Sequence, residues 1–270
     1  MVLYAEIISL FSMFHTKERI SMKFPLILLS ITSFGLAFSA EPSSINSMSD
    51  GDYCEKLIAA IKKEDQCSIE SLWNLPGGTW TIERLLLKNK LDPNIQGNPK
   101  GHALVHWAAR ANNPDILEVL CVEKTNIDIK NKNGCTALSF AVAQAKVQAT
   151  KVLLDRGADP NIVNEEYHAS LHSALKGYFS MGTSYKANYL KIIVLLIENL
   201  KTSVNKPDRE GKTPLHYAVI FGCTKIVKLL LGCQRIDLGI KDRENKTALD
   251  YAREKGINEL IELLSSNKQK

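Results

Sequence analysis

The sequence lacks the short motifs that mark several common catalytic and metal sites. It has no Cys-x-x-Cys pair, which argues against a zinc ribbon. It has no Gly-x-Ser-x-Gly, which would hold a nucleophilic serine on a sharp turn, and no His-Glu-x-x-His, which would place two zinc ligands on one helix face. We therefore expect a protein that is not an enzyme and that binds neither a metal nor a cofactor.

A strong charge of either sign is also lacking. The 34 Lys and Arg residues exceed the 29 Asp and Glu residues by only five, and the two signs are mixed along the chain. Nucleic-acid-binding proteins usually carry a concentrated basic patch, so no nucleic-acid partner is expected. A composition of 45% hydrophobic and 23% charged residues is typical of a folded soluble protein rather than of a disordered chain or one that spans a membrane several times.

The first 40 residues differ from the rest and are typical of a secretory signal peptide. Lys17, Arg19 and Lys23 precede an apolar run at residues 24–38, which is followed by small residues and then by a polar stretch. A basic end, a short apolar core and a small-residue exit are the parts of such a signal. The run is shorter than the ~20 residues that a membrane-spanning helix needs. A mildly apolar helix or an uncleaved membrane anchor is the alternative.

The small residues suggest where this signal is cut. Ala37 and Ser39 would stand at the −3 and −1 positions of a cut after Ser39, so that the mature chain would begin at Ala40. Residues 1–21 place a second apolar stretch ahead of the signal, and a true start at Met22 would remove it. All six cysteines follow the cut, and free thiols are the simplest expectation for most of them. Cys54 and Cys67 form the most plausible pair, because both lie in an irregular region.

The rest of the chain contains a segment that is repeated five times. Each copy has an apolar residue followed three positions later by alanine, and each is followed by a second apolar block. The apolar positions are spaced by 33, 33, 44 and 34 residues: Val105, Leu138, Leu171, Leu215 and Leu249. Units of this length cannot bury their apolar faces alone, so the pattern predicts a stack of similar units.

The repeated segment resembles the ankyrin repeat. Residues 211–219, Gly-Lys-Thr-Pro-Leu-His-Tyr-Ala-Val, are similar to its first half, and residues 153–161 are similar to its second half, which ends in Gly-Ala-Asp-x-Asn. The resemblance implies an all-α repeat solenoid of stacked helix-turn-helix units with short hairpin loops. It places five repeats, including a C-terminal cap, in residues 97–270. Residues 41–96 are expected to form an N-terminal cap with a degenerate repeat.

The resemblance also assigns structural roles to polar residues. His106, His172 and His216 occupy one repeat position, where the histidine of the family joins adjacent loops by hydrogen bonds. Asp159, Asp208 and Asp242 fit the turns between units, where aspartate binds nearby backbone. Tyr167 stands where a turn residue with positive φ is expected, and that turn should be strained or have another shape.

Unit three is longer than unit two by 11 residues, and the excess falls near residues 176–187. We expect it to form a long loop between the two helices of that unit. Tyr178, Phe179, Met181 and Tyr185 are large apolar groups for such a loop. Aromatic residues and methionine are common in interface cores, which favours a partner contact. Alternatively, the segment folds back and extends the helices.

In ankyrin arrays, partners usually contact the hairpin tips and the exposed side of the first helices. Ile220 and Phe221 stand where the family usually has polar or small residues, so they are candidate apolar anchors, unless the last unit or the loop covers them. The full set of candidate partner-binding residues is Arg110, Lys132, Gln144, Glu166, Tyr178, Phe179, Tyr185, Arg209, Lys212, Ile220, Phe221 and Arg243.

The sequence therefore predicts an exported module that binds a protein partner through the concave face of an ankyrin array. Proteins with this combination of signal and repeats resemble those that host-associated bacteria send to the periplasm or outside the cell. The membrane would be contacted only through the N-terminal signal, if that signal stays uncleaved. A cytoplasmic or membrane-anchored scaffold or inhibitor is the alternative, and an enzyme with an unrecognised site is a third possibility.

Overall fold

The computed structural model describes residues 48–75, 77–88, 90–96, 98–121, 125–166 and 168–267. Within these ranges the chain forms thirteen helices and no strand. None of these helices is long and apolar enough to cross a membrane. The predicted signal peptide and the predicted strained turn at Tyr167 lie outside the described residues.

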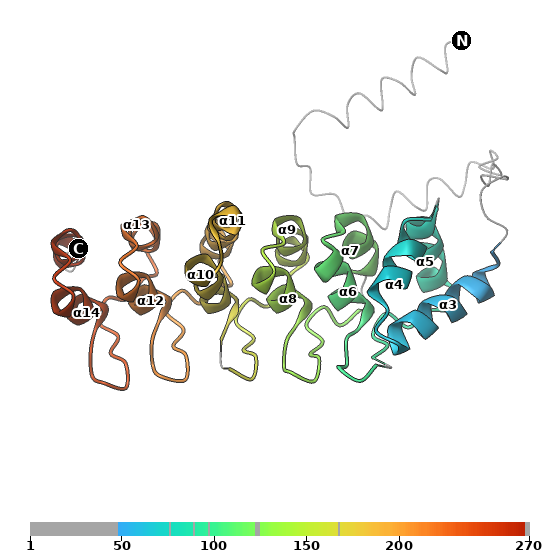
Figure 1. Ribbon diagram of the computed structural model, residues 1–270, viewed down its shortest axis with the longest axis horizontal. Helices are drawn as coiled ribbons and strands as arrows, with labels where there is room; N and C mark the ends of the chain where they lie inside the picture. Colours follow the sequence, from blue (N-terminus) through green and yellow to red (C-terminus); the bar gives the residue numbers. More distant parts are fainter. Residues whose placement is uncertain are drawn as a thin grey trace, which may run out of the picture. The chain divides into compact units, whose positions relative to one another are not determined.

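Ten of the helices form five pairs that stack in a row, and the loops between pairs project as hairpins from one side of the row (Figure 1). The helix next to the hairpins is called the inner helix and its partner the outer helix. The inner helices are α6 (Leu104–Ala111), α8 (Ala137–Ala143), α10 (Ser170–Ser180), α12 (Pro214–Ile220) and α14 (Ala248–Glu254). The outer helices are α7 (Pro114–Leu120), α9 (Val147–Asp155), α11 (Thr183–Glu198), α13 (Thr224–Leu231) and α15 (Asn258–Asn267). The predicted all-α repeat solenoid is confirmed.

The inner helices carry small residues where they meet their neighbours, and α8, α12 and α14 also begin with a strong start signal. Thr136 Oγ1 accepts a hydrogen bond from the Ser139 backbone N–H at 3.2 Å, which satisfies one of the free donors of the first turn of α8. Pro214 opens α12, where its missing N–H costs nothing. The recurring alanines are fully buried and let adjacent helices approach closely: Ala108, Ala141, Ala174, Ala218 and Ala252.

Three helices precede the five pairs: α3 (Asp50–Lys62), α4 (Gln66–Trp73) and α5 (Gly78–Leu87). Helix α4 contacts the inner helix α6, and α5 contacts the outer helix α7, so these two take the places of an inner and an outer helix. Helix α3 packs against both, and its buried Tyr53 donates a hydrogen bond to the Leu72 carbonyl at 3.1 Å. The apolar faces of α4 and α5 are thereby covered at this end of the stack.

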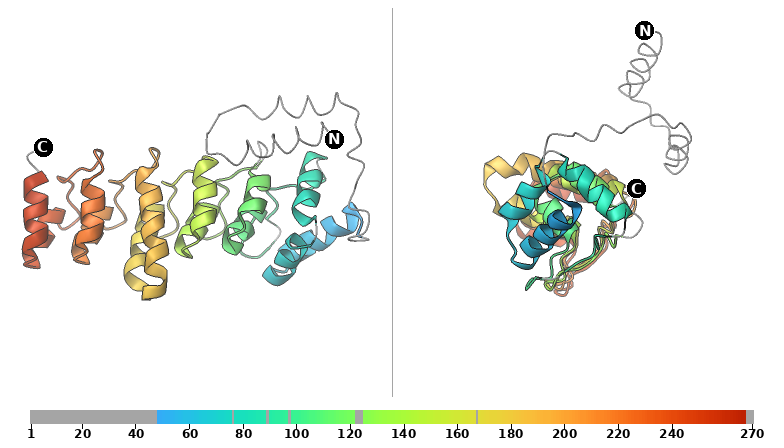
Figure 2. Two further views of the ribbon diagram at one scale, coloured as in Figure 1. Left: turned by 90° about the horizontal axis from the view of Figure 1, so that it is seen from above. Right: turned by 90° about the vertical axis from the view of Figure 1, so that its right-hand side faces the viewer.

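The long loop predicted in unit three is not present. Most of the extra residues lengthen α10 and α11, which are joined by Met181 and Gly182 alone. Figure 2 shows α11 (gold) reaching beyond the outer helices on either side of it. The extension is held because Tyr189 of α11 is buried and its hydroxyl donates to the Ala143 carbonyl at the end of α8, at 2.7 Å. The alternative that the segment extends the helices is therefore the correct one.

Close contact between the two long helices depends on Gly177. A methyl group there would overlap the ring of Tyr189, and it would lie 2.7 Å from the tyrosine hydroxyl. We expect Gly177→Ala to lower the free energy of unfolding by about 1–3 kcal/mol, the usual cost of overpacking a core. Thermal and chemical unfolding followed by circular dichroism would measure this change.

The matched control is Gly182→Ala, two residues beyond the end of α10, where an added methyl group meets no atom within 4 Å. This substitution should change the free energy of unfolding by less than about 0.5 kcal/mol. Equal stability of the two variants would contradict the packing described for α10 and α11.

Candidate interaction surface

The hairpins are built around one polar residue that recurs in each unit. Asp208 Oδ1 accepts hydrogen bonds from the backbone N–H groups of Glu210 and Lys212 at 2.9 and 2.8 Å, and Asp242 does the same for its own hairpin. This role of both aspartates agrees with the sequence-based prediction. In two earlier hairpins, Asn131 and Asn164 accept the same backbone hydrogen bonds, with the amide oxygen in place of a carboxylate oxygen. Their spacing along the chain was the signal that could have identified them.

Hydrogen bonds from the three repeat-position histidines fix the inner helices α6, α10 and α12 to the next hairpin. His106 Nε2 donates to the Cys135 carbonyl at 3.0 Å, while its Nδ1 accepts from the Ala103 N–H at 3.1 Å. His216 makes the equivalent pair, with the Lys246 carbonyl and the Thr213 N–H, both at 3.1 Å. The structural role predicted for these histidines is confirmed, including His172, which contacts the Lys212 carbonyl at 3.2 Å.

A second set of contacts ties each tyrosine of the last two inner helices to its own hairpin. The Tyr217 hydroxyl donates to Asp208 Oδ2 at 2.7 Å, and the Tyr251 hydroxyl donates to Asp242 Oδ2 at 2.6 Å. Burial, followed by the hydrogen bond to Asp208, raises the pKa of Tyr217. Both carboxylate oxygens of each aspartate are therefore engaged, and the hairpins are held in one position against the helices.

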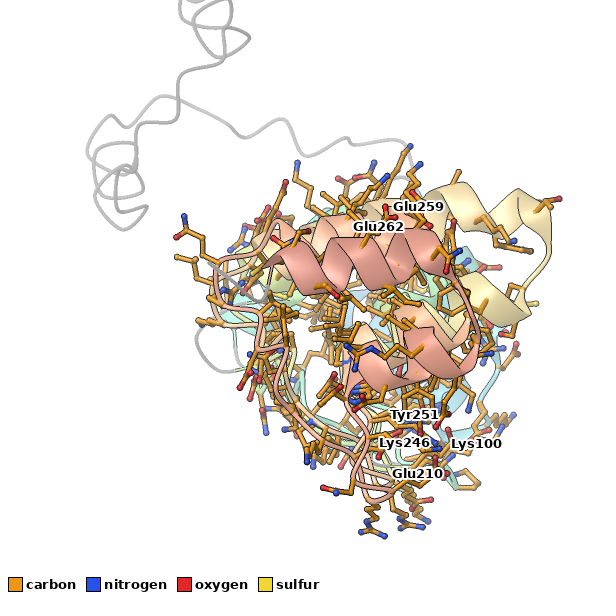
Figure 3. All side chains as sticks on the ribbon, turned by 90° about the vertical axis from the view of Figure 1, so that its left-hand side faces the viewer. Lys100, Glu210, Lys246, Tyr251, Glu259 and Glu262 are labelled. Carbon is orange, nitrogen blue, oxygen red and sulfur yellow. The ribbon has the colours of Figure 1, made fainter. Side chains whose placement is uncertain are left out.

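The hairpin tips carry charges that neutralise one another locally. Lys176 pairs with Glu166 at 3.1 Å, and Lys212 pairs with Glu210 at 2.6 Å. Figure 3 looks along the stack and places Lys100, Glu210, Lys246 and Tyr251 on the hairpin side, with Glu259 and Glu262 on the outer helix α15. Exposed ion pairs contribute little to stability, so these groups remain available to a partner.

The structure brings together the aromatic residues of units three and four, at the ends of α10 and α12. The rings of Phe179 and Phe221 are stacked, with centroids 4.2 Å apart and planes inclined by 15°. Tyr178 meets Phe179 edge-on at 5.3 Å. Phe221 nevertheless stays 53% exposed, and Met181 and Tyr185 are 48% and 52% exposed. We call these three aromatic residues, together with Met181 directly after α10 and Tyr185 in the first turn of α11, the aromatic patch.

The candidate binding residues fall into two rows rather than one surface patch. The hairpin row contains Lys132, Glu166, Arg209, Lys212 and Arg243. The helix-end row, which includes part of the aromatic patch, contains Arg110, Gln144, Tyr178, Phe179, Tyr185, Ile220 and Phe221. An inner helix of seven residues, at 1.5 Å per residue, separates the rows by about 10 Å.

Three residues of the helix-end row are half-buried and do not belong to the stacked aromatic rings. The Arg110 guanidinium lies 5.8 Å from the ring centroid of Trp107, and Gln144 directly follows α8. Ile220 ends α12 and is partly covered. Phe221 is covered on one side by Phe179 of the extended helix, so the predicted covering is present in part, and 53% of the Phe221 side chain stays exposed.

Side chains of the types that bind metals are scattered in the part of the chain that is described. No group of three or more His, Cys, Asp or Glu residues lies close enough there to hold a metal ion. All six cysteines are free thiols, and Cys54 and Cys67 are not joined as the sequence suggested. Cys54 instead lies 3.5 Å from the Lys90 carbonyl, and Cys67 is exposed.

Comparisons with known proteins agree with this repeat geometry. A family model described as ankyrin repeats (3 copies) matches residues 76–164 and 180–270. A fowlpox virus ankyrin repeat protein is 28% identical over 146 residues, which cover 54% of this chain and 94% of that protein. A mimivirus ankyrin repeat protein is 29% identical over 147 residues, but these span only 18% of its length.

Two further similarities are to a yeast protein and to a solved structure. A Saccharomyces cerevisiae protein, named as a probable 26S proteasome regulatory subunit, is 26% identical over 166 residues, covering 60% of this chain and 68% of that protein. The crystal structure of an ankyrin repeat protein superposes with a TM-score of 0.58 at 23% identity, covering 78% of this chain and 97% of that one. At this identity the last match supports the fold alone.

The buried histidines make stability depend on pH. Burial lowers the pKa of His106 and of His172 to about 4, against ~6.5 in an unfolded chain. The stability that their neutral forms provide is complete above about pH 6.5 and is lost as the pH falls toward 4. For each of the two histidines, we expect the free energy of unfolding to fall by about 2 kcal/mol as the pH is lowered from 7 to 5, because the unfolded chain takes up the proton more readily than the folded one.

Urea unfolding at pH 7, 6 and 5 would measure this loss. This pH range lies above the ordinary pKa values of most carboxylates, so their protonation contributes little to the change. A variant with both His106→Gln and His172→Gln should be less stable at pH 7 but should change less between pH 7 and 5. An unfolding free energy of the unmodified protein that is the same at pH 7 and 5 would rule out this coupling.

Proposed function

Because the chain belongs to the ankyrin-repeat family, whose arrays are protein–protein interaction modules, we propose that it binds a protein partner along the side that carries its inner helices and hairpins. The observation that carries this proposal is the aromatic patch. Phe221 keeps 53% of its surface exposed although it stacks on Phe179. Large apolar groups exposed together on a folded surface commonly mark interaction sites.

The character of the patch supports its role as an anchor. Aromatic residues and methionine are enriched in interface cores, and binding energy concentrates in a few such residues ringed by polar groups. The two rings are held in one stacked arrangement, and the hydrogen bonds of His172 and His216 fix the helices that carry them. A partner would therefore lose little binding free energy to ordering this surface.

The hairpin row would add specificity around that anchor. Lys132 and Arg243 are exposed, and no ion pair is found for either among the described residues. Glu166 and Lys212 are engaged in exposed ion pairs that a partner charge can replace. Charges at the rim of an interface mainly select the partner and speed association, rather than supplying most of the affinity.

Export is the second part of the proposal, and its support lies in the sequence. Lys17, Arg19 and Lys23 precede the apolar run of residues 24–38, and small residues follow at positions 37 and 39. This order is typical of a cleaved signal, which would deliver the array to the periplasm or outside the cell. A cytoplasmic or membrane-anchored scaffold would use the same binding surface.

Replacing the exposed anchor tests the binding site. We expect Phe221→Ala to weaken partner binding by more than about 1 kcal/mol, or at least about fivefold, because an interface anchor is lost while the buried core is untouched. The partner would first be captured by chemical crosslinking and mass spectrometry in native extract, and the purified pair would then be titrated by calorimetry.

The matched control for this test is Leu200→Ala, which removes an 86% exposed apolar side chain two residues beyond the end of the outer helix α11. It should leave the affinity within about twofold. Unchanged affinity of Phe221→Ala together with a lower melting temperature would mean that the patch only stabilises the extended helix pair. The binding site would then have to be sought among the hairpin residues.

Processing of the N-terminus tests export. We expect the mature chain to begin at Ala40 or Glu41, because a cut after Ser39 or Ala40 would remove the apolar run. Mass spectrometry of the protein isolated from its native cell would identify the first residue. Protein that retains residues 22–40 intact would show that the signal is not cleaved and would favour the anchored or cytoplasmic alternative.

A further inference from the structure

The two helix pairs that carry the aromatic patch are free of acidic residues over long stretches. Neither residues 167–197 nor residues 211–236 contain an Asp or a Glu. The same stretches contain seven cationic residues: Lys176, Lys186, Lys191, Lys212, Lys225, Lys228 and Arg235. For a chain with nearly balanced charge, this is a marked local excess of one sign, and it lies in the two units that form the patch.

Some of these cations are neutralised or engaged by groups from other elements. Three lysines pair with acids of the hairpins or of α15: Lys176 with Glu166 at 3.1 Å, Lys212 with Glu210 at 2.6 Å, and Lys228 with Glu259 at 3.0 Å. The Arg235 guanidinium donates to backbone carbonyls near the end of α11, including that of Thr202 at 2.7 Å. These four groups therefore have structural partners.

The remaining three lysines have no acidic partner among the described residues. Lys186, Lys191 and Lys225 are all exposed, and no ion pair is formed by any of them. Two of them adjoin the aromatic patch. Lys186 Nζ lies 5.7 Å from the ring centroid of Tyr178, and Lys225 stands in the first turn of α13, four residues after Phe221. An apolar surface is thus flanked by unneutralised positive charge.

We propose that the aromatic patch docks an acidic segment of the partner protein that presents a large apolar side chain. This inference rests on the proposed function and specifies the chemistry of the partner. The apolar side chain would contact Phe221, Met181 and Tyr185, and carboxylates on either side of it would pair with Lys186 and Lys225. A basic segment would face uncompensated repulsion, which is a common means of rejecting wrong partners.

A peptide segment fits this surface better than a nucleic acid does. Nucleic-acid sites need many cations in a continuous groove that follows the phosphate backbone. Here the unpaired lysines are few, and the chain as a whole carries only five excess positive charges. Charge pairing at exposed lysines is screened by salt, so the affinity should fall as ionic strength rises.

Selection from a random peptide library displayed on phage, using the immobilised full chain, tests this proposal. We expect the enriched peptides to carry a net negative charge and at least one large apolar residue. The best peptide would then be synthesised, labelled and titrated by fluorescence anisotropy at low and high salt. Reversing both charges, with Lys186→Glu and Lys225→Glu, should weaken its binding by at least about tenfold at low salt and by much less at high salt.

The control reversal is Lys151→Glu, on the exposed face of the outer helix α9, which should leave the affinity within about twofold. Enriched peptides that need Phe221 but are neutral or basic would overturn the acidic specificity and leave the proposed binding site standing. Peptides that bind regardless of Phe221 and of both lysines would overturn the site as well. Tighter, Phe221-dependent binding of a 20-nucleotide oligothymidine would reassign the surface to nucleic acid.

Discussion

Each unit of this protein depends on its neighbours to cover its apolar faces. Buried alanines such as Ala141 and Ala174 let the inner helices pack closely, and leucines such as Leu153 and Leu196 fill the space behind them. Such packing resists separation but leaves the angle between units loosely defined, because apolar contacts have little directionality. Hydrogen bonds from His106, His172 and His216 to the following hairpins supply the missing direction.

A stack of this kind tolerates an insertion that grows outward from one unit. The extra residues of unit three lengthen both of its helices without displacing the neighbouring pairs (Figure 2). The Tyr189 hydroxyl donates a hydrogen bond to the Ala143 carbonyl of the preceding unit, and the Phe179 ring stacks on Phe221 of the following one. The insertion therefore contacts units on both sides, and it is the element that assembles an apolar surface from separate repeats.

The distribution of charge divides the surface into two kinds of region. On the hairpin side, lysines and glutamates of a hairpin and of the inner helix that follows it pair with one another, as Lys246 does with Glu244 of its hairpin and Glu254 of α14. Around the aromatic patch, residues 167–197 and 211–236 carry lysines but no acids, and Lys186 and Lys225 form no ion pair with any described residue. Recognition in this protein is accordingly expected to combine a neutralised polar rim with a positively charged apolar anchor site.

The sequence by itself determined the fold, because the repeat spacing and motifs such as Thr213-Pro214 report local helix starts and a periodic core that each unit repeats. It also identified the aspartates of the turns and the role of the histidines. It did not determine the course of residues 176–187, since a helix extension and a loop differ in packing against other units rather than in composition. The repeat register places the ends of the inner helices of units three and four side by side, but only the tertiary structure decided that Phe179 stacks on Phe221, because the register does not report how side chains at those ends pack.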